Sequence, residues 1–229
     1  MTYVSKTHSG VPALCIGVAF AGHLIRVWWL ELTIGPVAER SVYALEDVLT
    51  IIDSPLWLVS GVMHLVVAAA LSAMALSEPD RAAADHPKRH PAATAALIGS
   101  GSFLLLGMTN LIGVPQIGTL TELCAEDGRT ALVAYNIIRT VFLGSSFLVL
   151  GWFLLSDAGS ELRSSDGPKL IHVIGLIAGV LCVLFVFSYR AAPLLITTLM
   201  MATVMVWGLG LALSTLVISG SKSEINNGA

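Results

Sequence analysis

Charged residues are scarce in this chain of 229 residues: only 12% are Asp, Glu, Lys or Arg, whereas 55% are hydrophobic. The formal net charge is −3, and the few basic residues form no stripe that could collect phosphates, which argues against a nucleic-acid partner. The apolar residues stand in long blocks instead of alternating with polar ones. This composition excludes a soluble globular domain and predicts a polytopic membrane protein.

Motifs for several kinds of chemistry are also missing. The three cysteines, Cys15, Cys124 and Cys182, have no paired spacing, so we expect neither a disulfide framework nor a zinc site. There is no HExxH motif and no pair of carboxylates in the middle of an apolar block, and the Ser60 and His64 pair is only a loose one, so an enzyme has little support. Every lysine lies in a tail, in a loop or at a predicted cytoplasmic helix start, which excludes a retinal Schiff base.

The apolar blocks have the length of membrane-spanning helices. Crossing a hydrocarbon layer of about 30 Å takes about 20 helical residues, and six blocks meet or approach that length. Three of them begin with proline, which is well tolerated at the first position of a helix. We therefore predict an all-α integral membrane protein, a single domain over residues 1–229, whose six transmembrane helices cover 11–34, 55–76, 91–114, 130–155, 170–187 and 193–218.

Basic residues are distributed unevenly between the two sides of this predicted bundle. Seven fall on the side of the termini and three on the other: Lys6, Arg81, Lys88, Arg89, Arg163, Lys169 and Lys222 against Arg40, Arg129 and Arg190. Because positive charge accumulates on the cytoplasmic side, we expect both termini in the cytoplasm. The acidic stretches 39–53 and 122–127 would then face outward from a membrane that we expect to be a bacterial inner membrane.

A short amphipathic segment lies between the first two spans. Val42, Leu45, Leu49 and Ile52 repeat at helical spacing, with Glu46 among the polar residues between them. This pattern predicts a short helix lying at the outer interface.

Two arginines fall inside predicted spans, Arg26 in the first and Arg139 in the fourth. A charge at that depth costs on the order of 3 kcal/mol or more, so it needs compensation. Snorkelling to the outer headgroups would provide it, although both arginines lie roughly 12 Å or more below the outer ends of their spans. The alternative is that they point into the bundle and meet a negative partner there.

Further polar residues share the depth of the arginines. At helical rise, His64 lies at about the level of Arg26 and Arg139, and His23 lies one turn deeper. Polar stripes on three helices converge on this level, which predicts a pocket open outward and sealed toward the cytoplasm. The predicted lining consists of Arg26, His64, Arg139, His23, Trp57, Ser60, Asn110, Tyr135, Asn136 and Asp53.

Three hypotheses account for such a pocket. In the first, it binds an anionic or amphipathic small molecule or a lipid, in a receptor, a transporter or the membrane component of a larger complex. In the second, the chain is an accessory or assembly subunit whose arginines meet acidic residues of another membrane protein subunit. In the third, His23 and His64 ligate a b-type haem whose propionates meet the arginines; without haem, no metal site is expected.

Overall fold

The computed structural model of the chain describes residues 10–34, 44–54, 56–77, 90–163, 169–188 and 193–227, and every regular element in these ranges is an α-helix. The helices are α1 (Gly10–Ile34), α2 (Leu45–Ile52), α3 (Leu56–Leu76), α5 (His90–Leu123), α6 (Ala125–Arg163), α7 (Lys169–Ser188) and α8 (Pro193–Asn227). All except α2 are long and apolar enough to cross a membrane, which agrees with the six predicted spans.

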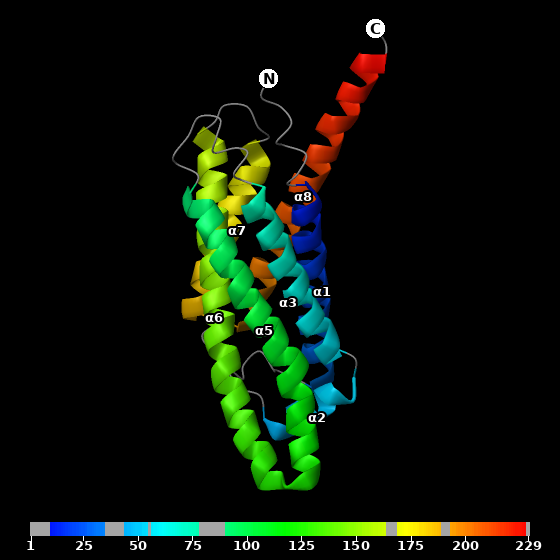
Figure 1. The fold of residues 1–229 in the computed structure, drawn as a ribbon, viewed down its shortest axis with the longest axis vertical. Coiled ribbons are helices and arrows are strands. Elements are labelled where there is room, and N and C mark those ends of the chain that lie inside the picture. The colour runs from blue at the N-terminus through cyan, green and yellow to red at the C-terminus, as the bar shows by residue number, and fades with distance from the viewer. Residues whose placement is uncertain are drawn as a thin grey trace.

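The six long helices form a closed ring. Each packs against the next along the chain, and α8 returns to pack against α1 (Figure 1). Buried side chains from all six helices fill the ring, among them Phe20, Phe103, Phe147, Phe185 and Trp207. The core sits inside this ring, so a polar group that points inward must find its partner within the protein.

The outward faces of the helices are apolar as well. Ile25, Val141 and Leu195 are 70%, 62% and 63% exposed, although each belongs to the apolar part of a long helix. The hydroxyls of Thr109 and Thr203 donate to carbonyls four residues earlier in their own helices, which removes unpaired polar groups from these faces. A bundle that is apolar both inside and outside is typical of membrane-spanning helices.

The helices α5 and α6 run well past the predicted spans 91–114 and 130–155 and leave no long loop between them. Cys124 alone separates them: its N–H donates to the carbonyl of Leu120 at 2.8 Å, and its own carbonyl accepts from the N–H of Gly128 at 3.1 Å. The helix α5 also continues through Pro115. Falling hydropathy marks where a helix leaves the apolar layer, whereas the helix itself ends only where its backbone hydrogen bonds end.

This long α5–α6 hairpin projects beyond the other helices at one end of the molecule, which we call the hairpin end (Figure 1). The helices α6 and α8 also continue past their predicted ends at 155 and 218, and α8 projects at the opposite end.

The helix α2 lies at the hairpin end and packs against α5, α3 and α6. Its buried residues are Asp47, Val48 and Ile51, whereas the predicted apolar face, Leu45, Leu49 and Ile52, is only partly buried. The side of this helix that packs on the bundle is therefore offset from the apolar face that the sequence indicates. The carboxylate of Asp47 accepts the N–H of Ala44 at 2.9 Å, and this local bond lets an acidic residue lie on the packed side. Residues 39–43 of the predicted amphipathic segment lie outside the described residues, as do Pro55 and residues 78–89 between the second and third predicted spans.

Candidate functional site

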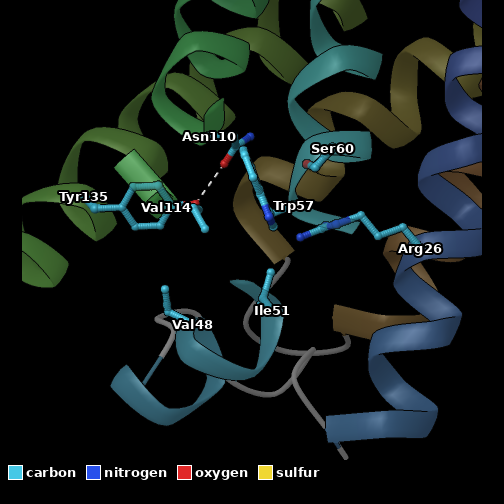
Figure 2. Close-up of a pocket in the computed structure, with 8 residues that line it drawn as sticks. All are labelled: Arg26, Val48, Ile51, Trp57, Ser60, Asn110, Val114 and Tyr135. Atoms are coloured by element: carbon cyan, nitrogen blue, oxygen red, sulfur yellow. Dashed lines mark hydrogen bonds between the residues drawn. The ribbon is translucent and has the colours of Figure 1, made fainter. Parts of the chain in front are cut away.

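A small cavity lies at the hairpin end, between the ring and α2. Its lining comes from α1, α2, α3, α5 and α6 and consists of Arg26, Val48, Ile51, Trp57, Ser60, Asn110, Val114 and Tyr135 (Figure 2). Its volume of about 10 Å³ has room for about one water molecule. The cavity is therefore nearly closed in this conformation.

The helix α2 covers the cavity. Val48 and Ile51 point from α2 into it, as Figure 2 shows. The same two side chains belong to a second apolar cluster with Leu30, Val114, Ile117, Leu132 and Tyr135, separate from the main core of the ring. The covering helix is thus held largely by apolar contacts that do not involve the ring's main core.

One wall of the cavity is a chain of hydrogen-bonded side chains from three helices. The hydroxyl of Tyr135 on α6 donates to Oδ1 of Asn110 on α5 at 2.8 Å. The amide nitrogen Nδ2 of Asn110 lies 3.3 Å from Nδ1 of His64 on α3 and bonds to it. Gly113 permits this arrangement, because a Cβ at that position would lie 2.6 Å from Cδ2 of Tyr135. The chain fixes the orientation of a buried amide that would otherwise be costly to bury.

Behind this wall, His23 and His64 are in direct contact. Their ring centroids are 4.3 Å apart at an interplanar angle of 44°, and the side chains are only 4% and 5% exposed. Nε2 of His23 is buried without a hydrogen-bond partner among the described residues. Phe20 packs edge-on against His23, and Phe103 stacks on His64 with 6.0 Å between the ring centroids. Phe147 packs against both phenylalanines and against Phe185. These packed aromatic rings separate the histidines from the opposite end of the bundle.

The contact between the two histidines does not fit a b-type haem. An iron ligated by both imidazoles would hold the two rings on opposite faces of a porphyrin. Rings whose centroids are 4.3 Å apart leave no gap for that macrocycle. The part of the chain that the structure describes also contains no group of three or more His, Cys, Asp or Glu arranged to hold a metal ion.

The two arginines lie beside this cluster, as their depth predicts. Both are half-buried, and both are close enough to His64 for their charges to act on it, while Arg26 also acts on His23. The side chain of Arg26 reaches from α1 toward Trp57 at the cavity (Figure 2). No residue that lines the cavity is acidic. Arg26 is therefore the one charged residue among those that line the cavity.

Eight of the ten predicted residues form one connected group, which lines the cavity or adjoins it. Arg26, Trp57, Ser60, Asn110 and Tyr135 line the cavity, while His64, His23 and Arg139 adjoin it. Asn136, the residue after Tyr135 on α6, is buried, and its backbone carbonyl accepts a hydrogen bond from the hydroxyl of Thr140.

Asp53 lies outside the cavity. It is exposed at the end of α2, and its N–H donates to the carbonyl of Leu49. The prediction extended the polar stripe of the second span back to Asp53 at helical spacing, whereas α2 ends at Ile52 and α3 begins at Leu56. The break in the backbone removes Asp53 from the stripe that Trp57, Ser60 and His64 form.

Sequence reasoning missed the apolar part of the site. Val48, Ile51 and Val114 line the cavity, and Phe20 and Phe103 hold the two histidines. The helical spacing in the segment before the second span was a usable signal for α2, but it does not give the phase of a helix whose buried side includes an acidic residue. No sequence feature distinguishes these phenylalanines from ordinary core residues.

The described residues form an all-helical ring of six long helices, with a small cavity at one end that α2 covers and that Arg26 helps to line. Comparisons of the chain with protein families, with curated proteins and with solved structures give no match.

Proposed function

We propose that this chain is an integral membrane protein that binds the anionic head group of an amphipathic molecule or lipid in the cavity beneath α2. The observation that carries this proposal is the cavity lining, where Arg26 provides a positive charge and no residue is acidic. A guanidinium offers forked N–H donors that match the oxygens of a carboxylate or a phosphate.

The other lining residues suit an amphipathic ligand. Trp57 and Ser60 carry an indole N–H and a hydroxyl as further donors for an anionic group. Val48, Ile51 and Val114 offer an apolar wall for the first carbons of a tail. The tail itself would continue between helices whose outward faces are already apolar.

The present volume is too small for such a ligand. About 10 Å³ holds one water, so binding requires α2 to move away from the ring. The helix is suited to this motion because it is short and contacts the bundle mainly through a separate apolar cluster. The protein would then act as a receptor, a transporter or the ligand-capturing subunit of a complex.

The distribution of basic residues supports an orientation for this site. With the termini in the cytoplasm, the hairpin end and the cavity face outward from a bacterial inner membrane. The ligand would then arrive from the outer leaflet or from the periplasm.

Binding of three probes with the same tail tests the proposal. We expect purified protein in mild detergent to bind dodecanoate and dodecyl phosphate, and to bind the neutral dodecanol about tenfold or more weakly, because the charge-assisted bond to Arg26 is lost. Replacing the guanidinium in Arg26→Met should weaken binding of both anions by about 10- to 100-fold. Calorimetry and native mass spectrometry measure both effects.

The matched control is Arg129→Met, which removes an exposed arginine near the hairpin turn, outside the cavity lining, and should bind as the wild type does. Equal binding of dodecanoate and dodecanol, or unchanged binding in Arg26→Met, would overturn the proposal. Co-purification of the wild type with a second membrane protein, without binding of either anion, would favour the accessory-subunit hypothesis instead.

A further inference from the structure

The two contacting histidines lie directly behind the cavity wall. Asn110 lines the cavity and bonds to Nδ1 of His64, and the ring of His64 touches that of His23. Ser60, which also lines the cavity, lies one turn from His64 on the same helix. One residue, Asn110, thus separates His64 from the proposed anion, and His23 lies behind His64. Binding of an anion by Arg26 alone gives neither imidazole a role.

The groups that face the histidine pair come from four helices. Arg26 on α1 and Arg139 on α6 bring positive charge. The backbone of Ser60 on α3 forms a hydrogen bond with His64. On α5 the neighbours are Asn110 and Phe103, both uncharged, and the hydroxyl of Tyr135 is engaged with Asn110.

Among the described residues, the charges that act on either imidazole are the guanidinium groups and the other imidazole, and none comes from α7 or α8. A carboxylate that would stabilise an imidazolium ion is therefore missing from this set. An anion in the cavity would bring negative charge to this neighbourhood, where the low dielectric makes each charge effective over several ångströms.

We infer that binding of an anion in the cavity is coupled to the uptake of one proton by the His23–His64 pair. This inference rests on the proposed function. The proton comes from bulk water or buffer, whose conjugate base remains in solution, and it forms an N–H bond with a ring-nitrogen lone pair. The site then takes an anion and a proton together, which is the net composition of a weak acid.

The geometry suits one shared proton better than two. The rings touch at 4.3 Å, so a second imidazolium would lie directly against the first, with both guanidinium groups nearby. Nε2 of His23 is buried and has no partner among the described residues, so this side of the pair includes a polar atom that packing alone does not explain.

Isothermal calorimetry with decanesulfonate tests the inference, because this probe remains an anion throughout the range from about pH 6 to about pH 9. Titrations at one pH in buffers of different ionisation enthalpy give the number of protons taken up. We expect about one proton per ligand bound, and about tenfold weaker binding for each pH unit of increase where uptake is complete.

His64→Gln should bind the probe without proton uptake, so its affinity should not change with pH. His23→Gln should lose all or part of the proton uptake. The control His172→Gln removes a buried histidine of α7 outside the cavity lining and should keep the wild-type proton count. If the histidine pair serves only in packing, His64→Gln and His23→Gln would lower thermal stability and keep the wild-type proton count.

The proton count of the wild-type protein is decisive by itself, so the inference can be tested even if a histidine variant fails to fold. Binding of decanesulfonate without proton uptake over this pH range would overturn the inference and leave the proposed function intact. Absence of binding for decanesulfonate, dodecanoate and dodecyl phosphate alike would overturn both.

Discussion

At the scale of single residues, the buried hydrogen bonds between helices explain why polar groups are tolerated in an apolar bundle. Asn110 is satisfied on both sides, by Tyr135 and by His64, and each of the three side chains comes from a different helix. In a low dielectric, a complete series of hydrogen bonds stabilises the fold, whereas a buried polar group that loses its partner destabilises it. The chain also sets the shape of the cavity wall, because Asn110 and Tyr135 both line it.

Removing one hydroxyl from this chain should have a measurable cost. In Tyr135→Phe, Oδ1 of Asn110 loses the donor seen at 2.8 Å, and we expect the free energy of unfolding to fall by about 1 kcal/mol. Denaturation in mixed micelles followed by circular dichroism measures the change. Thr109→Val is the control, since that hydroxyl bonds only to the carbonyl of Leu105 in its own helix and should change stability little. Equal stabilities of the two variants would contradict this role for Tyr135.

Among the helices, α2 is the element that covers the cavity. It buries only Asp47, Val48 and Ile51 and covers a cavity that holds about one water. Its remaining contact with α5 includes Ile52, whose Cδ1 would lie 2.9 Å from a Cβ at Gly118. Under the proposed function, motion of this short helix relative to α5 is the step that admits the ligand.

A covalent tether between these two positions should block ligand exchange. We expect Ile52→Cys combined with Gly118→Cys, in a Cys124→Ser background, to be joined by a short, reducible thiol-specific cross-linker, because the Ile52 side chain reaches the Gly118 position. Exchange of dodecanoate, measured by stopped-flow displacement, should slow by at least about tenfold and recover on reduction. Each single cysteine variant serves as a control. Unchanged exchange in the fully cross-linked protein would show that the ligand does not enter beneath α2.

At the scale of the whole molecule, the ring is closed by the contact between α1 and α8. The two backbones approach most closely at Gly208, where a Cβ would lie 2.6 Å from the carbonyl oxygen of Ala13 and 2.7 Å from the nitrogen of Gly17. Both atoms belong to the backbone, so neither can rotate away as a side chain would. Small residues at such crossings allow helices to pack closely where no hydrophobic driving force holds them together.

Adding one methyl group at this crossing should separate the two helices. For Gly208→Ala we expect a loss of about 1–3 kcal/mol in the free energy of unfolding, with a lower Tm in detergent. Gly101→Ala is the matched control, because a Cβ there meets nothing within 4 Å, and alanine favours the helix. A Tm for Gly208→Ala equal to that of the control would contradict the close crossing.

Most of the site could be predicted because depth and helical phase are local properties. Arg26, His64 and Arg139 lie at one level of their helices, and this level follows from counting residues from the ends of apolar blocks. The prediction failed at Asp53 because a backbone break shifts the phase, and it missed Val48 because the packed side of α2 includes an acidic residue. Both failures concern a helix of eight residues, whose apolar pattern is too short to fix its orientation.

The number of long helices, their approximate positions and the polar level within them follow from the amino-acid sequence, because each depends on residues near one another in the chain. The closure of the ring between α8 and α1, the position of α2 over the cavity and the contact of His23 with His64 are visible only in the folded chain. These features depend on contacts between segments far apart in the chain, where side-chain volume and close backbone approach select one packing among many.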